Sequence, residues 1–127
     1  MPKPRRLLIA DDNLDAADSL AVLLRLDGHE VTVVHDGRSA VDRVRELSPS
    51  IALLDIGMPQ LDGYEVARLL RQGLSRDALT LIAVTGWGQE SDVARAIAAG
   101  FDYHFTKPIE PARLASLLAS RLPSDRD

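Results

Sequence analysis

A carboxylate at the end of an apolar run is the residue of this sequence whose chemistry is most evident. Residues 51–54 are Ile-Ala-Leu-Leu, a run with the length and composition of a buried strand, and Asp55 follows them directly. Removing a carboxylate from water is costly unless it has partners. Gly57 and Pro59 break regular structure soon afterwards, so Asp55 is expected where a strand gives way to a loop. Ligands of parallel α/β sheets bind at such strand ends, which makes Asp55 a candidate reactive group.

Three other expected strands end in residues that suit phosphate chemistry. Asp11 and Asp12 follow the first apolar run, Thr85 ends the fourth, and Lys107 follows the fifth. In a parallel sheet these ends lie on one edge, so three carboxylates, a hydroxyl and an ammonium group would share one pocket. Neighbouring carboxylates repel one another unless a cation intervenes, and Mg²⁺ prefers oxygen ligands of this kind. The set indicates phosphoryl transfer onto Asp55, with Mg²⁺, Lys107 and Thr85 neutralising the transferring oxygens.

Each of these residues also has an ordinary structural interpretation when it is taken alone. The run Asp11-Asp12-Asn13 is suited to cap the helix that follows it. Thr85 is a common residue type for a strand, Lys107 before a proline suits a solvated loop, and Asp55 could cap a turn. The functional interpretation depends on finding suitable residue types at four separate strand ends.

The apolar pattern predicts five alternating strand and helix units. Short apolar runs of strand type occupy residues 7–10, 31–35, 51–54, 79–85 and 103–106. Apolar residues at helical spacing mark residues 14–24, 40–47, 64–72, 91–99 and 114–122. Strands that are almost wholly apolar indicate a parallel sheet covered by helices on both faces. We expect an α/β fold of the flavodoxin-like, doubly wound type, with a five-stranded parallel sheet in the order 2-1-3-4-5 and five helices.

Length and composition narrow the class of protein. The chain has 127 residues, which suits one domain, and we expect that domain to span residues 5–122 with flexible termini at 1–4 and 123–127. The net charge of −4 offers no attraction to nucleic acid or to anionic membranes. The absence of cysteine excludes disulfides and thiolate metal sites. The first apolar run is too short for a signal peptide or a membrane span. We therefore expect a cytoplasmic protein with no direct nucleic-acid or membrane partner.

Four segments resemble the receiver domains of two-component response regulators. They are Leu-Ile-Ala-Asp-Asp-Asn at residues 8–13, Leu-Leu-Asp-Ile-Gly-Met-Pro-Gln-Leu-Asp-Gly at 53–63, Ala-Val-Thr-Gly at 83–86 and Phe-Thr-Lys-Pro at 105–108. The resemblance extends from residue 7 to about residue 122 and is specific when the segments are taken together. Residues 57–68 and 100–109 look most like receivers of hybrid sensor histidine kinases. With neither a kinase core nor a DNA-binding domain, the chain is expected to be a stand-alone receiver or one cut from a longer protein.

The resemblance implies that Asp55 is the phosphoacceptor and that it lies beside a metal site for Mg²⁺, with Mn²⁺ as an alternative ion. Asp12 would ligate the metal directly together with Asp55, and Asp11 would act largely through water. The backbone carbonyl of Gly57 would supply a further ligand.

The resemblance also implies how the phosphoryl group arrives and what it changes. Its oxygens would be bound by Thr85 and Lys107, and the Lys107–Pro108 peptide bond is often cis in such folds. The donor would be a phosphohistidine on a histidine kinase or a histidine phosphotransfer protein. Thr85 would move toward the phosphoryl group and repack the face of the fourth helix, fifth strand and fifth helix, through which a homodimer is also expected. Such a domain is no separate enzyme, since it catalyses only its own phosphorylation and dephosphorylation.

One position departs from the family. Where the family usually has tyrosine or phenylalanine, three residues before the lysine, this chain has His104. Its neighbours Tyr103 and Phe105 are expected on the opposite face, because residues of a strand alternate. Either His104 takes the switch role as a more polar, pH-sensitive partner of Thr85, or it is a partly exposed histidine with no coupling role. Trp87 would either shield the acyl phosphate from water or serve as an exposed partner contact.

Other functions are weighed against these residues. A haloacid-dehalogenase-type phosphatase also uses a strand-end aspartate and Mg²⁺, but the position of its second acidic residue holds Gly57 here. Nucleotide binding is weaker still, because neither Gly-x-Gly-x-x-Gly nor the P-loop pattern occurs. A receiver fold kept purely as an interaction module, without phosphorylation, predicts the loss of an acidic, threonine or lysine site residue. All of these residues are present, so we rank that alternative below an active receiver.

Overall fold

The computed structural model describes residues 4–86, 90–120, 122, 124 and 125. Within this part of the chain, strands and helices alternate as the apolar pattern predicts. The strands are β1 (Arg6–Ala10), β2 (Glu30–Val34), β3 (Ile51–Asp55), β4 (Thr80–Thr85) and β5 (Tyr103–Thr106). The helices are α1 (Leu14–Leu26), α2 (Gly37–Leu47), α3 (Gly63–Arg71), α4 (Glu90–Ala99) and α5 (Pro111–Ala119). No helix among the described residues is long and apolar enough to cross a membrane.

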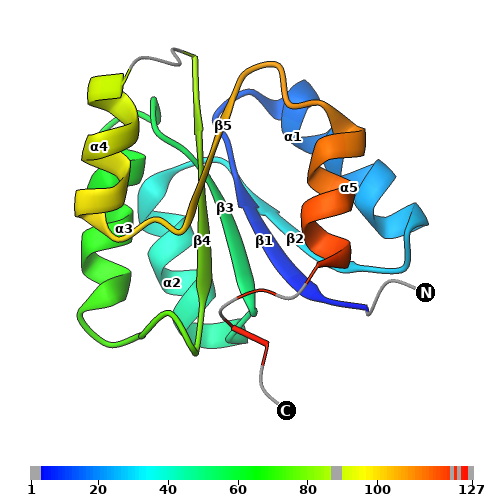
Figure 1. Ribbon diagram of the computed structural model, residues 1–127, viewed down its shortest axis with the longest axis horizontal. Helices are drawn as coiled ribbons and strands as arrows, with labels where there is room; N and C mark the ends of the chain where they lie inside the picture. The colour runs from blue at the N-terminus through cyan, green and yellow to red at the C-terminus, as the bar shows by residue number, and fades with distance from the viewer. Residues whose placement is uncertain (1–3, 87–89, 121, 123, 126–127) are drawn as a thin grey trace.

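The five strands form one parallel sheet in the order β2-β1-β3-β4-β5. Figure 1 shows α1 and α5 on one face of this sheet and α2, α3 and α4 on the other. The predicted flavodoxin-like, doubly wound architecture is therefore confirmed. Because all strands run in the same direction, their carboxyl ends meet at one edge of the sheet and their amino ends meet at the opposite edge.

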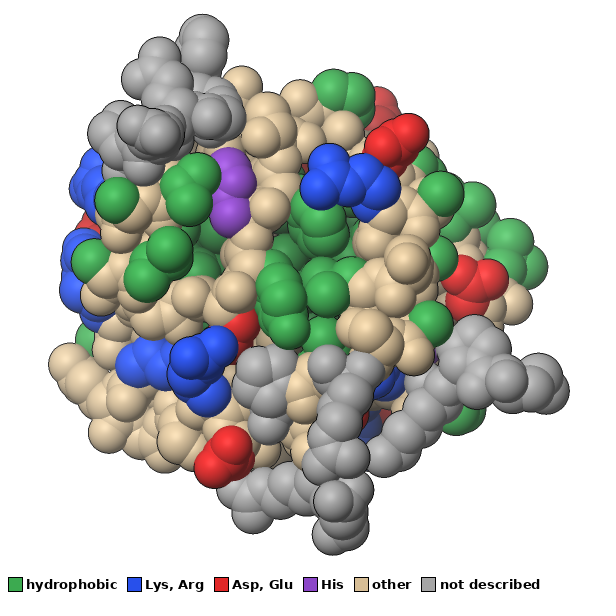
Figure 2. All heavy atoms as spheres, viewed as in Figure 1, with side chains coloured by type: hydrophobic (Ala, Val, Ile, Leu, Met, Phe, Trp, Pro, Cys, Tyr) green, Lys and Arg blue, Asp and Glu red, His purple; other side chains and the backbone are tan. Residues whose placement is uncertain are grey.

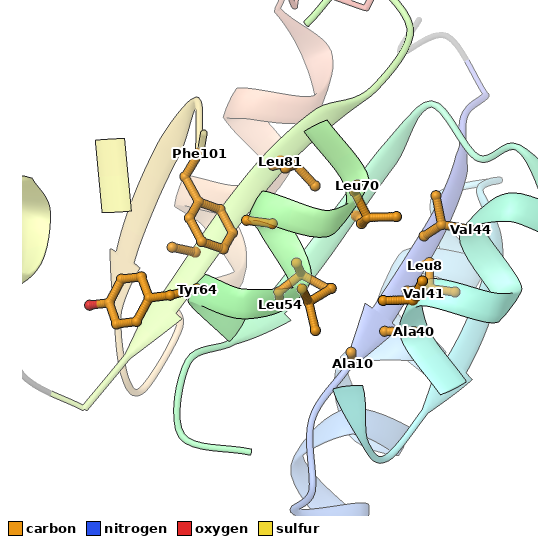
Figure 3. Packing of buried hydrophobic residues seen from close by; sticks show 14 of the residues in the cluster. Leu8, Ala10, Ala40, Val41, Val44, Leu54, Tyr64, Leu70, Leu81 and Phe101 are labelled. Atoms are coloured by element: carbon orange, nitrogen blue, oxygen red, sulfur yellow. The ribbon is translucent and has the colours of Figure 1, made fainter. Parts of the chain in front are cut away.

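Alternation along the strands divides the core into two layers. Leu8 and Leu54 belong to the layer with α2, α3 and α4, where Figure 3 also shows Tyr64. Ile9 and Leu53, their neighbours in sequence, belong to the layer with α1 and α5. All four strand residues are at most 2% exposed. Both faces of the strands are therefore buried, which explains why they read as continuous apolar runs.

Side-chain caps set where α1, α2 and α3 begin. Asn13 caps α1 by accepting a backbone N–H of the first turn. Asp62 caps α3 in a reciprocal capping box with Glu65. In the Asp11-Asp12-Asn13 run the capping role thus falls to Asn13, which leaves the side chains of Asp11 and Asp12 available at the sheet edge.

The second strand ends at Val34 rather than at the predicted His35. Its neighbour β1 ends at Ala10, and the N–H of Asp11 makes the next hydrogen bond to the carbonyl of Val34. Val34 is the last residue of β2 in the register with β1, and Asp36 caps α2. His35 instead lies at the sheet edge, where its Nδ1 is 3.1 Å from the carbonyl oxygen of Asp11.

The chain after α5 packs against the amino edge of the sheet. The helix stops short of the predicted Leu122 because Ser120 has an extended backbone. The guanidinium of Arg5, whose side chain is 4% exposed, binds the carbonyls of Leu118 and Ser120 and both carboxylate oxygens of Asp125 at 2.6 and 2.9 Å. The domain limits of 5 and 122 stay a prediction, and these contacts add Asp125 to the residues that pack on the domain.

A buried carboxylate marks the amino end of β5. Asp102, with its side chain 0% exposed, accepts hydrogen bonds from Arg71 Nη2 at 2.8 Å, from the N–H of Leu81 at 2.9 Å and from Arg76. The guanidinium of Arg71 also donates to the carbonyl of Gly100 at 2.9 Å. Burial lowers the pKa of Arg71, and the charge of Asp102 opposes this shift. The network joins α3, β4 and the connection before β5, and so fixes where β5 begins.

Candidate functional site

Four of the predicted site residues meet at the carboxyl edge of the sheet. Asp55 is the last residue of β3, Asp11 and Asp12 follow β1, and Lys107 follows β5. One carboxylate oxygen from each aspartate lies within 4.8 Å of the others. Asp55 is buried, Asp11 is partly buried and Asp12 is exposed, so the cluster is open to solvent at Asp12.

The ammonium group of Lys107 compensates part of this negative charge. Its Nζ donates to Asp55 Oδ2 at 3.0 Å and lies 3.8 Å from Asp11 Oδ2. Burial lowers the pKa of Lys107, but the hydrogen bond to Asp55 and the charges of the aspartates outweigh this and raise it. Burial raises the pKa of Asp11, and the neighbouring Asp55 raises it further. The hydrogen bond from the N–H of Asn13 opposes this shift. One ammonium facing three carboxylates therefore leaves the site with an excess of negative charge.

Backbone N–H groups hold two of the carboxylates in place. The N–H of Gly57 donates to Asp55 Oδ1 at 3.0 Å, and the N–H of Asn13 donates to Asp11 Oδ1 at 2.9 Å. Both bonds span two residues and form Asx turns. A Cβ atom at Gly57 would meet only Asp55 Oδ1, at 3.8 Å. The space on this side of the Asp55 carboxylate is therefore left open by the glycine.

A cleft of about 440 Å³ leads from the carboxylates into the groove between α1 and the β5–α5 connection. Asp55, Asp11 and Lys107 lie at one end of the cleft. The walls beyond them are mostly apolar and include Ala16, Leu20, Leu23, Ile109 and Pro111. The candidate reactive group thus faces an accessible cleft, although its own side chain is buried.

Thr85 lies at the same edge, and its hydroxyl contacts His104. Thr85 Oγ1 and His104 Nε2 are 2.9 Å apart, and the carbonyl of Thr85 accepts the N–H of Lys107 at 2.7 Å. Tyr103 and Phe105 pack instead in the layer with α1 and α5, which confirms the predicted alternation of β5. The structure therefore places His104, rather than an aromatic neighbour, against Thr85.

Two further predictions concern the loops of this edge. The Lys107–Pro108 peptide bond is cis, and Trp87 lies outside the described residues. The contact of His35 with the Asp11 carbonyl was not predicted. A histidine directly after the second strand of a parallel sheet, at the edge that carries the acidic residues, is the signal that would have identified this contact.

The oxygen atoms of Asp11, Asp12 and Asp55 fit a hard divalent cation. Such cations favour carboxylate and carbonyl oxygens, and Mg²⁺ is typically held by one or two carboxylates together with phosphate oxygens. The raised pKa of Asp11 is due in part to the charge of Asp55, and a cation between the two would relieve this repulsion. The donor set and its excess charge are therefore those of a magnesium-type site.

Known proteins share both the sequence pattern and the fold. The family model of the response regulator receiver domain matches residues 7–119. The DNA-binding response regulator MtrA of Mycobacterium tuberculosis (strain ATCC 25618 / H37Rv) is 32% identical over 123 residues, which cover 97% of this chain and 53% of that protein. The chain thus spans about half the length of MtrA.

Solved structures agree with this result. A CheY-like response regulator receiver domain protein from Methanospirillum hungatei JF-1 is 26% identical with a TM-score of 0.83, and the match covers 91% of both chains. The receiver domain of the sensor histidine kinase PA1611 from Pseudomonas aeruginosa PAO1, which has a magnesium ion coordinated in its active site cleft, is 28% identical with a TM-score of 0.81. That match covers 91% of this chain and 95% of the PA1611 domain. The chain belongs to the family of response regulator receiver domains.

Proposed function

We propose that this receiver domain accepts a phosphoryl group from a phosphohistidine onto Asp55. The observation that supports this most directly is the buried carboxylate of Asp55, held by Gly57 and Lys107 at the end of an accessible cleft. In the transfer, an Asp55 oxygen forms a bond to phosphorus while the P–N bond to the donor imidazole breaks. The leaving imidazole keeps the electron pair of that bond and takes up a proton.

Lys107 and Thr85 are proposed to bind the oxygens of the transferred group. The ammonium of Lys107 is already 3.0 Å from Asp55 Oδ2, so it would pair with a phosphoryl oxygen once Oδ1 or Oδ2 carries the phosphoryl group. The Thr85 hydroxyl would donate a hydrogen bond to another oxygen after leaving its present contact with His104. Lys107 is therefore already in contact with the acceptor, whereas the Thr85 hydroxyl would have to move to reach the phosphoryl group.

We propose that Asp11, Asp12, Asp55 and the carbonyl of Gly57 hold Mg²⁺, with Mn²⁺ as an alternative. When bound, the ion would neutralise charge on the transferring oxygens. The excess negative charge of the three carboxylates supports this assignment. The magnesium ion in the cleft of the PA1611 receiver domain is further support.

The donor is proposed to be a histidine kinase or a histidine phosphotransfer protein. Val22, Leu23 and Leu26 of α1 are 53, 44 and 78% exposed, and Leu23 also lines the cleft that ends at Asp55. An apolar strip of this kind next to the acceptor suits docking against apolar helices of the donor. The lack of cysteine is compatible with the cytoplasmic location that such a donor requires.

The phosphorylation signal is proposed to pass to partners through the face of α4, β5 and α5. The same face is proposed to form a homodimer. Figure 2 looks onto this face and shows hydrophobic side chains between α4 and α5, with Lys and Arg side chains nearby. Ile97 of α4 is 67% exposed, and its burial would favour association. The domain would be no separate enzyme, because the position two residues after Asp55 is Gly57, which has no side chain to act as an acid or a base.

Phosphorylation at Asp55 can be measured by intact mass after incubation with acetyl phosphate and Mg²⁺. We expect a labile gain of about 80 Da, the mass of one phosphoryl group, which is lost in Asp55→Asn and in excess EDTA. Asp18→Asn, at an exposed position of α1, is the matched control and should be phosphorylated like the wild type. If acetyl phosphate gives no gain, a phosphohistidine protein replaces it as donor. A folded, Mg²⁺-binding wild type that accepts phosphate from neither donor would rule out the proposed function and favour an interaction module.

A further inference from the structure

His104 and Thr85 lie on the same side of the sheet. In the β4–β5 register, His104 is opposite Ala83, and Ala83 packs in the layer with α2, α3 and α4. Thr85 is two residues after Ala83, so strand alternation directs it to the same side. Its hydroxyl is 2.9 Å from His104 Nε2, and Thr85 is only 5% exposed. His104 is only partly buried, so the bond is partly sheltered from water.

The carboxylate of Asp55 belongs to the other side of the sheet. Asp55 is opposite Val84 in the β3–β4 register, and Val84 packs in the layer with α1 and α5. The cleft at Asp55 opens toward α1 and the β5–α5 connection. A phosphoryl group on Asp55 would therefore lie across the end of β4 from His104. The Thr85 hydroxyl would have to leave His104 in order to donate to it.

We propose that His104 is a positioning residue that holds the Thr85 hydroxyl away from the phosphoryl site in the unphosphorylated domain. This inference rests on the proposed function, because it assumes that Thr85 binds the phosphoryl group on Asp55. The bond to His104 and the bond to the phosphoryl group compete for one hydroxyl, so the energy of the first is lost when the second forms. His104 thereby disfavours the phosphorylated conformation relative to the unphosphorylated one.

The phenylalanine or tyrosine that is usual at this position differs in this respect. A phenylalanine ring has no group that could replace Nε2 as a hydrogen-bond partner, so it would not oppose the movement of the Thr85 hydroxyl toward Asp55. The expected size of the effect follows from the net energy of one partly sheltered hydrogen bond, which corresponds to a factor of about 2 to 12 in an equilibrium constant. The effect is therefore large enough to be measured as a change in affinity.

The affinity for beryllofluoride in the presence of Mg²⁺, measured by calorimetry, tests this proposal, because beryllofluoride mimics the phosphoryl group without being hydrolysed. We expect His104→Phe to bind about 2- to 12-fold more tightly than the wild type. His104→Gln, which keeps a hydrogen-bonding group for Thr85, should bind like the wild type. Equal or weaker binding by His104→Phe would overturn the proposal.

A second measurement follows the imidazole of His104 itself in the wild-type domain. The ¹⁵N signal of His104 Nε2 in the free wild type should differ from that in Thr85→Val, and saturating beryllofluoride should move the wild-type signal to the Thr85→Val position. The spectrum of His104→Phe, or of His104→Leu if the former does not fold, identifies this signal among the three histidines. An Nε2 signal that does not respond to saturation would overturn the positioning role alone. A wild type that binds no beryllofluoride would overturn the proposed function as well.

Discussion

Replacing Asp102 with alanine should destabilise the domain more than any substitution of an exposed charge near it. The Asp102 side chain is 0% exposed and accepts hydrogen bonds from Arg71, Arg76 and the N–H of Leu81. Alanine removes both carboxylate oxygens and with them all three hydrogen bonds. The guanidinium of Arg71, only 15% exposed, then keeps its charge without a carboxylate, and the N–H of Leu81 loses its partner.

The magnitude follows from these contacts. Breaking a buried ion pair by removing one partner costs about 3–5 kcal/mol. Arg71 retains its hydrogen bonds to the carbonyls of Leu79 and Gly100, so we expect the lower end, about 3 kcal/mol. Asp102→Asn keeps an oxygen for the N–H of Leu81 and should cost less, about 2 kcal/mol. Arg76→Ala, at a side chain that is 67% exposed, should cost about 0–1 kcal/mol.

Urea unfolding followed by circular dichroism measures these differences as changes in the free energy of unfolding. The order Asp102→Ala, Asp102→Asn, Arg76→Ala, from the largest loss to the smallest, is the expected result. An Asp102→Ala variant within about 1 kcal/mol of the wild type would refute the reasoning, as would equal losses in Asp102→Ala and Arg76→Ala. Where it is folded, in the absence of urea, Asp102→Ala should still be phosphorylated at Asp55, because the substituted side chain lies at the amino edge of the sheet.

Three further predictions concern the same edge. His29 is buried and accepts the N–H of Arg5 at Nδ1, and burial lowers its pKa from the usual 6.5. As the pH falls, His29 of the unfolded chain is protonated before that of the folded domain. The contribution of neutral His29 to the free energy of unfolding is therefore complete above about pH 6.5 and is lost between that value and the lower pKa of the folded state. Urea unfolding between pH 8 and 5 should show a steeper loss for the wild type than for His29→Gln, and equal slopes would contradict this. Asp125→Ala removes two hydrogen bonds from the buried guanidinium of Arg5 and should cost about 2 kcal/mol in the same assay. Truncation after Leu122 should cost at least as much, and an unchanged stability in both would show that the domain needs nothing beyond residue 122.

The fold and the carboxyl edge could be predicted because the signals that specify them are local. Each strand is a short apolar run, and the alternation of runs with helical patterns leaves few arrangements of a parallel sheet. Asp55, Asp11 and Lys107 end their strands or follow them within two residues. Once the strands are parallel, these side chains must gather at one edge, so their meeting required no knowledge of side-chain packing.

The contacts of the amino edge could not be predicted in the same way. Arg5 and Asp125 are 120 residues apart, and Arg71 and Asp102 are 31 apart. An arginine near a chain end, or at the end of a helix, suggests a solvated charge when only its neighbours in sequence are known. Which carboxylate reaches it depends on how the last helix and the connection before β5 pack. The same dependence explains why the end of α5 was predicted too late, at Leu122.

The two edges of the sheet differ in how well their polar and charged groups are matched. At the amino edge, donors and acceptors are matched. Arg5 binds Asp125, His29 accepts the N–H of Arg5, and Thr80 is bonded to Ser124 at 2.7 Å. At the carboxyl edge, three carboxylates face one ammonium, and a matched set of charges there would leave nothing for a cation or a phosphoryl group to neutralise. Natural proteins commonly hold such unfavourable charge where function needs it and compensate elsewhere. The matched amino edge can stabilise the sheet whose carboxyl edge carries the excess charge. Substitutions at Asp102 and Asp125 should therefore change stability without changing the chemistry of Asp55.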